Sequence, residues 1–185
     1  MNTVQPIRDK QKIEEMKEFL KNQSLRNYTL FTLGIYSGLR ISDLLKLNIS
    51  DVTDSNGTIK SRIAIKEKKT SKPKDFPFNL KAISALNEYI SSVPSDQIVL
   101  FASRKGDKAI SREQSYKIIN DAARACGIED NIGTHTLRKT FGYILYKSGV
   151  NITRIQKLLN HSSPDITLAY IGITRDELDD IYMNM

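Results

Sequence analysis

Six side chains, spread from residue 40 to residue 170, have the chemical types needed to bind a phosphodiester and attack it. They are Arg40, Lys69, His135, Arg138, His161 and Tyr170. The chain has only two histidines, and both belong to this set. Arginine and imidazole groups can neutralise the charge that develops on phosphoryl oxygens, and a phenol can act as the nucleophile. Together they could cleave a phosphodiester without a metal ion.

The spacing of four of these residues supports a shared site. His135 and Arg138 are three positions apart, so on a helix they share one face and both can reach one oxyanion. His161 precedes Tyr170 by nine positions. A single H-x-x-R pair is common by chance, and most tyrosines are packing residues with a hydrated hydroxyl. These residues therefore indicate a catalytic site only when they are taken together.

Arg40 lies just after Gly38, at the boundary between two predicted helices. At such a boundary a side chain and nearby backbone N–H groups can converge on one phosphate. An isolated arginine is usually a solvated surface residue, so this interpretation again depends on the other residues. Asp43, three positions further on, would either orient Arg40 or cap the short helix that follows.

The charge of the chain is positive and unevenly distributed. There are 28 basic and 21 acidic residues, which give a net charge of +7 and a pI near 9.4. Net charge alone is a weak indication of nucleic-acid binding. However, residues 60–75 are dominated by lysine and arginine, whereas residues 175–180 are mostly acidic. One end of the domain therefore suits a polyanion.

The composition excludes several protein classes. Cys126 is the only cysteine, so the chain can form neither an internal disulfide nor a cysteine-based metal cage. No apolar run approaches the roughly 18 residues that a membrane span needs. The first residues lack the apolar region of a secretory signal. We expect a cytoplasmic protein without a metal site, cofactor or membrane association.

Hydrophobic periodicity predicts a single, mainly helical α+β domain over residues 1–185. Helices are predicted over residues 9–22, 25–36, 41–47, 80–90, 111–125, 134–147 and 153–159, with a last one that starts near Pro164 and carries Tyr170. Apolar and basic residues alternate over residues 59–66, which predicts a strand. Residues 68–74 would form a turn and residues 76–78 a return strand, giving one small antiparallel sheet at one side.

Three segments of this chain resemble the conserved boxes of the tyrosine recombinases, the phage integrase family. Residues 37–40 with Asp43 resemble the first arginine box, and residues 135–141 the second. Residues 158–163, followed by Thr167 and Tyr170, resemble the third. The resemblance extends from about Val4 to Tyr182, and the order and spacing of the boxes agree with it.

The resemblance implies a role for each matching residue. Tyr170 would attack the scissile phosphate and form a 3′-phosphotyrosyl link. Arg40 and Arg138 would hold the non-bridging oxygens, where a guanidinium can bond bidentately. His161 would donate a further hydrogen bond to the phosphoryl group. His135 would help to activate Tyr170, because a phenol with a pKa near ~10 needs such help at neutral pH.

The general acid would be one lysine of the predicted hairpin. Lys69 best matches the family pattern, but other hairpin lysines lie close to it, so the choice between them stays open. Asp43 would support the arginines. Contacts to DNA are expected from Lys66, Lys68, Lys72, Lys74, Arg112, Lys117 and Lys139.

The chain departs from the family pattern in two places. Asn160 stands where the family usually has glycine, and asparagine tolerates the same left-handed backbone. The helical core-binding domain that usually precedes the catalytic domain has no counterpart before residue 12. A chain without it would be either a minimal recombinase or part of a longer one, so tight site-specific binding by this chain alone is in doubt.

The resemblance also concerns assembly. Residues 171–185 would either fold onto their own core or dock on a neighbouring protomer. The family implies a monomer that assembles on double-stranded DNA as a homotetramer holding two sites.

The leading hypothesis is a DNA integrase or recombinase of a phage or other mobile element. The alternatives are a catalytically weak DNA-binding accessory protein and a relaxing enzyme similar to type IB topoisomerases.

Overall fold

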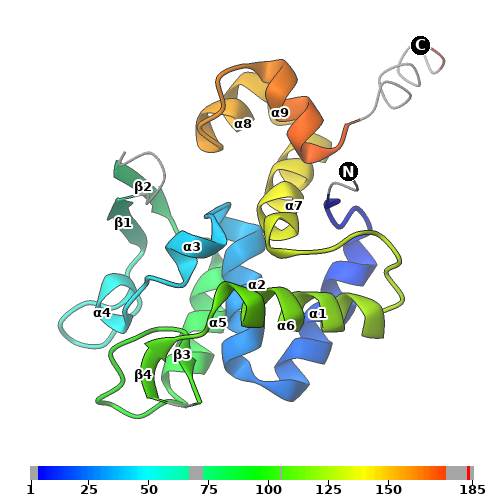
Figure 1. Cartoon of the computed structure of the whole chain (residues 1–185). Coiled ribbons are helices and arrows are strands. Elements are labelled where there is room, and N and C mark those ends of the chain that lie inside the picture. The colour runs from blue at the N-terminus through cyan, green and yellow to red at the C-terminus, as the bar shows by residue number, and fades with distance from the viewer. Residues whose placement is uncertain (1–3, 67–72, 105, 174–182, 184–185) are drawn as a thin grey trace.

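A computed structural model describes residues 4–66, 73–104, 106–173 and 183, and the chain in these ranges is mostly helical (Figure 1). The longer helices are α1 (Lys10–Gln23), α2 (Leu25–Ser37), α5 (Leu80–Ile90), α6 (Arg112–Ala125) and α7 (Thr134–Lys147). The shorter ones are α3 (Ile41–Leu44), α4 (Ile49–Val52), α8 (Ile152–Leu158) and α9 (Pro164–Ile171). Two small antiparallel sheets pair β1 (Arg62–Lys66) with β2 (Pro73–Pro77) and β3 (Ala102–Ser103) with β4 (Gly106–Ala109).

Helix α2 is the central element, because α1, α5 and α7 all pack against it. Its side chains are buried along most of its length, including Leu30, Phe31, Leu33 and Ile35. This explains why its apolar residues surround the helix instead of forming one stripe. Helix α2 ends at Gly38, whose φ of +60° is a left-handed conformation that glycine adopts without strain.

Three hydrophobic clusters stabilise the fold. The first lies between α2, α5 and the β1–β2 hairpin and includes Leu33, Ile63 and Phe101. The second joins α1, α2 and α6 through residues such as Met16 and Ile119. The third is formed by α7, α8 and α9. Its buried members are Tyr143, Ile155, Leu159, Ile171 and Ile173.

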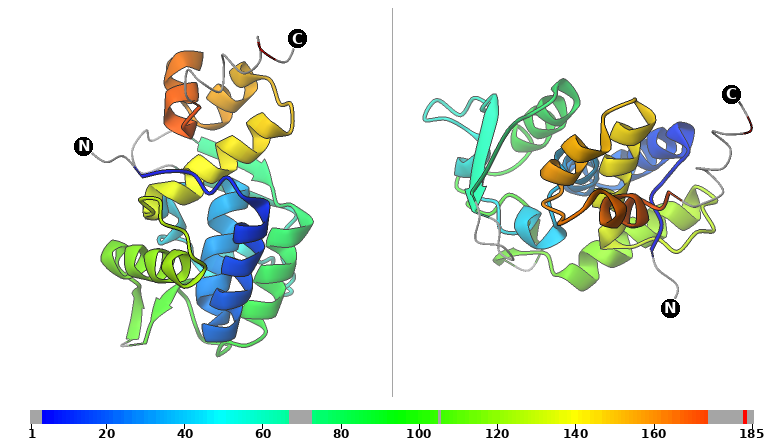
Figure 2. Two further views of the ribbon diagram at one scale, coloured as in Figure 1. Left: turned by 90° about the vertical axis from the view of Figure 1, so that its right-hand side faces the viewer. Right: turned by 90° about the horizontal axis from the view of Figure 1, so that it is seen from above.

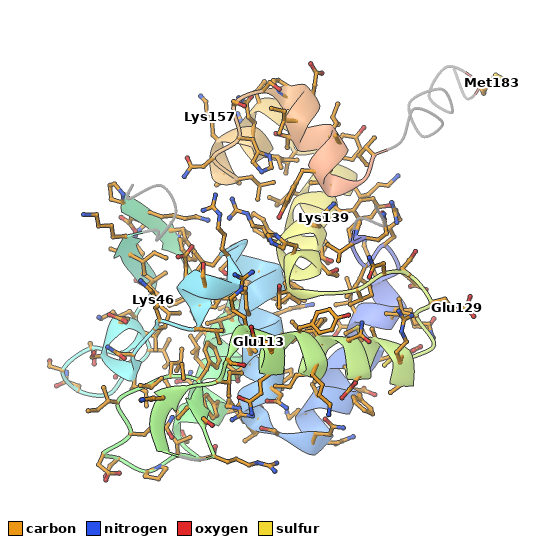
Figure 3. All side chains as sticks on the ribbon, viewed as in Figure 1. Lys46, Glu113, Glu129, Lys139, Lys157 and Met183 are labelled. Atoms are coloured by element: carbon orange, nitrogen blue, oxygen red, sulfur yellow. The ribbon has the colours of Figure 1, made fainter. Side chains whose placement is uncertain are left out.

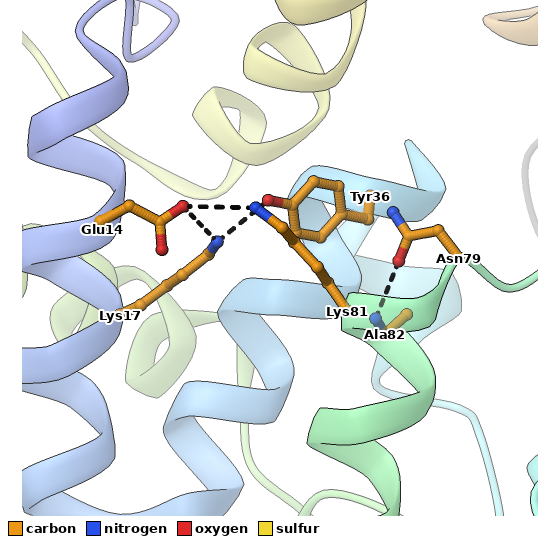
Figure 4. A network of polar contacts seen from close by, with 6 residues as sticks. All are labelled: Glu14, Lys17, Tyr36, Asn79, Lys81 and Ala82. Atoms are coloured by element: carbon orange, nitrogen blue, oxygen red, sulfur yellow. Dashed lines mark hydrogen bonds and ion pairs between the residues drawn. The ribbon is translucent and has the colours of Figure 1, made fainter.

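A network of polar side chains connects α1 to α2 and α5 (Figure 4). The Lys17 ammonium is buried and donates hydrogen bonds to Glu14 Oε1 at 2.8 Å and to Tyr36 Oη at 2.9 Å. Lys81 of α5 forms an ion pair with the same Glu14 oxygen at 3.6 Å. The buried lysine is thus neutralised, which removes most of the cost of taking its charge out of water.

The predicted helices are all present, with small shifts at their ends. Helix α7 begins at Thr134 after Gly133, so Thr134 is its first residue and not its N-cap. Helix α9 begins at Pro164, as predicted, and Ser163 is its N-cap. The helix predicted over residues 41–47 is shorter, because α3 ends at Leu44. Helix α4 was not predicted, and four residues are too few for a clear periodic signal.

The predicted sheet is the β1–β2 hairpin, in which Ile65 pairs with Lys74 and Ile63 pairs with Phe76. The strands differ from the predicted ranges. Ile59 lies before β1 in an isolated bridge with Thr53, and β2 begins at Pro73. The proline ring removes a backbone donor but is accepted at the two ends of an edge strand. The β3–β4 hairpin is a second small sheet that the sequence did not indicate, because its strands are very short.

The hairpin β1–β2 projects on one side of α3, whereas α8 and α9 stand together beyond α7 on the other side (Figures 1 and 2). The end of α2 and the start of α3 lie between these two parts. None of the described helices is long and apolar enough to cross a membrane.

Candidate active site

The segment that carries Arg40 is a tight connection between α2 and α3. Ser37 Oγ donates to the carbonyl of Leu33 at 2.6 Å and accepts a hydrogen bond from the Leu39 amide at 3.2 Å. Any Cβ at Gly38 would lie 2.4 Å from the Phe141 ring of α7. Positive φ and this close approach together require glycine. Arg40 is the N-cap of α3, and its carbonyl accepts hydrogen bonds from the amides of Asp43 and Leu44.

Arg138 connects this segment to the end of α8. Its side chain is only 3% exposed. One terminal nitrogen donates to the carbonyl of Gly38, and the other donates to the carbonyl of Leu159 at 2.5 Å. A guanidinium has five N–H groups in a fixed plane, so bonds to two carbonyls use only part of its capacity to donate. Arg138 can therefore hold three helices together and still face a bound anion.

His161 is held at the end of α8 by its backbone. The preceding Asn160 has a φ of +51°, so asparagine does adopt the left-handed conformation expected of it. The His161 amide donates to the Gln156 carbonyl at 3.0 Å, and the Gln156 side chain donates to the His161 carbonyl at 3.2 Å. His161 Nδ1 lies 3.2 Å from the hydroxyl of Thr167 in α9.

Tyr170 packs between His161 and Lys139. Its ring meets the His161 ring edge to face, with 4.8 Å between centroids, and the Lys139 ammonium lies 5.1 Å from the Tyr170 centroid. Figure 3 shows Lys139 on α7 close to α9. Burial raises the pKa of Tyr170, while the charges of Arg138 and Arg40 and a hydrogen bond from Arg138 act in the opposite direction. The phenol is therefore close to both arginines.

The arginines also affect the two imidazoles. Burial, followed by the charges of Arg138 and Arg40, lowers the pKa of His161 to about 4. Partial burial and the positive charges around His135, with Arg112 first among them, lower the pKa of His135 as well. Both rings are consequently neutral at pH 7. The shared dependence on Arg40 and Arg138 shows that one concentrated positive field covers the predicted site.

Five of the six predicted catalytic residues are thus brought into one region: Arg40, His135, Arg138, His161 and Tyr170. His135 differs from the others because its side chain is exposed, on the first turn of α7. Lys69 lies outside the described residues, as do Lys68 and Lys72 of the predicted DNA-binding set. Asp43 is 4% exposed and lies in the first turn of α3, three positions after Arg40.

The other predicted DNA-binding residues lie in different surroundings. Lys66, Arg112 and Lys117 are exposed, the first on β1 and the other two on α6. Lys139 is 9% exposed and faces the Tyr170 ring, and burial, with the charge of Arg8, lowers its pKa. Because of this placement, Lys139 belongs to the surroundings of the tyrosine, and its contact with DNA stays a prediction.

Lys74 is drawn inward, unlike Lys66. Its ammonium donates to the carbonyl of Ser37 at 3.4 Å and lies 5.2 Å from the centroid of the Phe76 ring. Alternation along β2 places Lys74 and Phe76 on the face of the hairpin that packs on the domain. The hairpin is thereby joined to the segment before Arg40.

The sequence analysis placed Thr167 in the third box without a role, and it did not place Lys139 beside the nucleophile. Thr167 is completely buried beside His161. Its position in the sequence, six residues after His161 and three before Tyr170, was the feature that could have indicated a place in the site. Within the part of the chain that the structure describes, no group of three histidine, cysteine or carboxylate side chains could hold a metal ion.

Comparisons with known proteins agree with this geometry. The family model described as "Phage integrase family" matches residues 8–177. A curated relative, the probable integrase/recombinase YoeC of Bacillus subtilis, is 45% identical over 176 residues, which cover 95% of this chain and 93% of the relative. The chain spans about half the length of several other curated tyrosine recombinases that it matches, for example 55% and 53% of two of them.

Solved structures share the same fold. The XerA recombinase superposes with a TM-score of 0.77 at 24% identity, over 98% of this chain and 66% of that one. The XerH site-specific recombinase, bound to a palindromic difH substrate in a post-cleavage complex, has a TM-score of 0.72 at 24% identity, over 98% and 53%. The family model matches nearly the whole length of this chain, and the three boxes meet around Tyr170. The chain therefore belongs to the phage integrase family, the tyrosine recombinases.

Proposed function

We propose that this protein breaks and rejoins DNA strands through a covalent link between Tyr170 and a 3′-phosphate. The observation that carries the proposal is the position of the Tyr170 phenol, which is held against His161 in the field of two arginines. Packing of a tyrosine does not require two arginines beside its hydroxyl. A nucleophile that attacks an anionic phosphodiester requires such charge.

Binding of the phosphodiester would be the first step. Arg40 and Arg138 would donate hydrogen bonds to the two non-bridging oxygens, and His161 would contact the same phosphoryl group. Because Arg138 is anchored on the Gly38 and Leu159 carbonyls, its guanidinium is already oriented before DNA arrives. Preorganised donors stabilise developing charge without a reorganisation cost at the moment of reaction.

Transfer would follow by in-line attack. Tyr170 Oη forms a bond to phosphorus as the bond to the 5′-oxygen breaks, and the phenolic proton passes to a base, for which His135 is the candidate. The leaving 5′-oxygen takes a proton from Lys69, in the role that the family assigns to that position. A free 5′-hydroxyl of a second strand reverses these steps and restores Tyr170. The bond energy is conserved in the phosphotyrosyl link, so no energy cofactor is required.

The partner would be double-stranded DNA, in keeping with the DNA complex of the XerH relative. Exposed basic residues on two elements would contact the phosphate backbone, which positions a protein but carries no base code. They are Lys66 on β1 and Arg112 and Lys117 on α6. A tetramer on two DNA sites would provide the second strand for rejoining, and residues 171–185 would help to join neighbouring protomers.

Covalent trapping tests the proposal. Wild type and Tyr170→Phe would be incubated in EDTA with nicked duplexes that lose a short fragment on cleavage, and the products separated on denaturing gels. DNA binding by each protein would be measured in parallel. Phe keeps the ring that packs on His161 and removes only the nucleophilic oxygen.

An adduct formed by the wild type and absent from Tyr170→Phe, with DNA binding retained, is the expected result. An adduct formed by Tyr170→Phe would refute the assignment of the nucleophile. DNA binding without any adduct would favour the accessory-protein alternative. Relaxation of supercoiled DNA by a monomer, without exchange between two sites, would favour the topoisomerase-like alternative.

A further inference from the structure

A threonine that the proposed mechanism does not use makes two contacts that together determine where the protons of His161 lie. Thr167 is completely buried in the first turn of α9. Its Oγ1 lies 3.0 Å from the carbonyl oxygen of Ser163 and 3.2 Å from His161 Nδ1. Both distances are those of hydrogen bonds.

The hydroxyl has one proton to share between these two neighbours. A carbonyl oxygen can only accept, so the contact between Thr167 Oγ1 and the Ser163 oxygen is a hydrogen bond only if the threonine donates. The remaining lone pairs of Oγ1 then face His161 Nδ1. The Ser163 oxygen also accepts from the Thr167 backbone amide at 3.2 Å, as at other helix turns. With the hydroxyl proton directed to Ser163, Nδ1 carries a proton and donates it, because two lone pairs facing each other at 3.2 Å would repel.

We propose that Thr167 is a positioning residue that keeps neutral His161 in the form protonated at Nδ1, which leaves Nε2 as a proton acceptor in the DNA-free site. The neutral imidazole has one donor and one acceptor nitrogen, and the partner of one nitrogen decides the role of the other. His161 can then donate to a phosphoryl oxygen only after a proton from solvent binds to Nε2.

The surroundings of His161 favour the neutral ring in the absence of DNA. Arg138 of α7 and Arg40, just before α3, are the positive groups that act on it, and Tyr170 of α9 packs against its ring. Burial together with these two arginines is also what lowers its pKa. A phosphodiester bound between the arginines would compensate their charge, so proton uptake at Nε2 and phosphate binding would support each other.

This inference deepens the proposed function and rests on it for the phosphate, but the proton position can be measured without DNA. The ¹⁵N chemical shifts of imidazole nitrogens distinguish protonated from unprotonated atoms. The chain has only two histidines, so a His135→Gln variant assigns the signals of His161 directly. At pH 7 the expected result is a protonated Nδ1 and an unprotonated Nε2 in His161.

Two variants of Thr167 separate the proton position from packing. Thr167→Ser keeps the hydroxyl and should keep the Nδ1–H form. Thr167→Val keeps the shape and removes the acceptor, so His161 should change to the Nε2–H form. A wild-type protein with Nε2 protonated at pH 7 would overturn the inference, as would an unchanged Nδ1–H form in folded Thr167→Val.

The pH profile of cleavage tests the consequence for the reaction. In Thr167→Val a neutral ring could donate from Nε2, so cleavage would no longer need proton uptake. The ratio of single-turnover rate constants, Thr167→Val over wild type, should rise between pH 6 and pH 9, by up to about tenfold for each pH unit above the pKa of His161 in the DNA complex, since titrations common to both proteins cancel. A constant ratio would show that His161 takes up no proton. Absence of cleavage in both proteins would refute the proposed function while leaving the NMR result valid.

Discussion

The helices α7–α9 and the β1–β2 hairpin both supply residues to the proposed site, but they hold their residues in opposite ways. In α7–α9, Arg138, His161 and Tyr170 are in contact with buried groups, and the third hydrophobic cluster lies directly beneath them. The hairpin is a two-stranded sheet with one exposed face. Lys66 extends into solvent there, and only the inward face packs on the domain.

This difference corresponds to the two tasks that the proposed reaction requires. Groups that stabilise the charge of the transition state are effective only when their geometry is fixed in advance. Lysines that follow a DNA backbone act through charge, and a solvated side chain on a flexible stem is sufficient for this. Lys74 is the exception within the hairpin, because its ammonium lies at the Ser37 carbonyl beside the arginine segment.

Replacement of Arg138 should have the largest effect. Arg138→Lys keeps the charge but cannot donate to both the Gly38 and Leu159 carbonyls, which lie on different elements. We expect a loss of about 3 kcal/mol in the free energy of unfolding, because these are charge-assisted bonds to buried acceptors. Covalent adduct formation should fall by about 10²- to 10³-fold, the usual cost of one transition-state donor.

The matched control for this change is Arg112→Lys, on the exposed start of α6. Its stability should stay within about 0.5 kcal/mol of the wild type. Unfolding in urea and single-turnover cleavage of a nicked duplex measure the two quantities. Equal stability of Arg138→Lys and wild type would contradict the structural role that we assign to Arg138.

A methyl group between α7 and α9 should disturb Tyr170 through its support. A Cβ at Gly142 would lie 2.6 Å from Ile171 Cγ2, next to the nucleophile. Overpacking of this kind costs about 1–3 kcal/mol. Gly142→Ala should therefore be destabilised and should also cleave about tenfold more slowly, because misplacement of reacting groups by 1 Å can cost about 10²-fold.

Gly34→Ala tests whether that loss of cleavage is specific. Its Cβ would lie 2.4 Å from Leu137 Cδ1, at the contact of α2 with α7. The two variants should lose similar stability in thermal unfolding. Cleavage measured well below both melting temperatures should be slower in Gly142→Ala. If Gly34→Ala is equally slow, the effect comes from general destabilisation and not from the position of Tyr170.

The sequence predicted the parts of the fold that depend on local patterns. Helices with a clear apolar stripe were found to within a few residues, and Gly38 and Pro164 were recognised as marking helix ends. The β3–β4 hairpin and α4 were missed, because very short elements form through tertiary contacts and have no period of their own. The side chains of the three boxes were predicted from their types, order and spacing.

Contacts across the fold were less accessible to sequence reasoning. Lys139 was predicted to contact DNA, and nothing in the sequence indicated that its ammonium lies against the Tyr170 ring. The sequence indicated a phosphate-binding role for Arg138 but no sign that it also donates to the carbonyls at positions 38 and 159. Such anchors join residues 100 and 21 positions apart and leave no periodic signal.

The two described hairpin lysines should differ when each is removed. Lys74→Ala loses the contact with the Ser37 carbonyl, so the hairpin should be positioned less well and cleavage should fall roughly threefold to tenfold at saturating DNA. Lys66→Ala should cleave normally at saturating DNA. Its DNA affinity should fall, with the slope of log K against log salt reduced by about 1, as for one lost phosphate contact.

Measurement of cleavage at saturating DNA and of binding at several salt concentrations distinguishes these outcomes. If Lys66→Ala alone slowed cleavage, the role in cleavage that we assign to the inward-facing Lys74 would be wrong. If both variants changed only the salt dependence, the whole hairpin would act through charge, and its contrast with α7–α9 would be complete.

The smallest expected effect concerns the pH dependence of stability, which should originate in α7–α9. The pKa of His161 is about 4 in the folded protein, whereas an unfolded histidine has a pKa near ~6.5. Between these values the unfolded chain binds more protons than the folded one, so stability falls as the pH decreases from 6.5 towards 4. His135 contributes in the same direction, because its pKa is also lowered.

Since His161 is only partly buried, solvent screening reduces its share of this loss to roughly 1 kcal/mol. His161→Gln should make the free energy of unfolding less dependent on pH between 6.5 and 4, measured by urea titration at several pH values. His135→Gln should have a smaller effect, because the His135 side chain is exposed. An unchanged pH dependence in His161→Gln would mean that the ring is not held in the positive field of Arg138 and Arg40. The contrast between the preorganised helices and the solvated hairpin would then fail at His161.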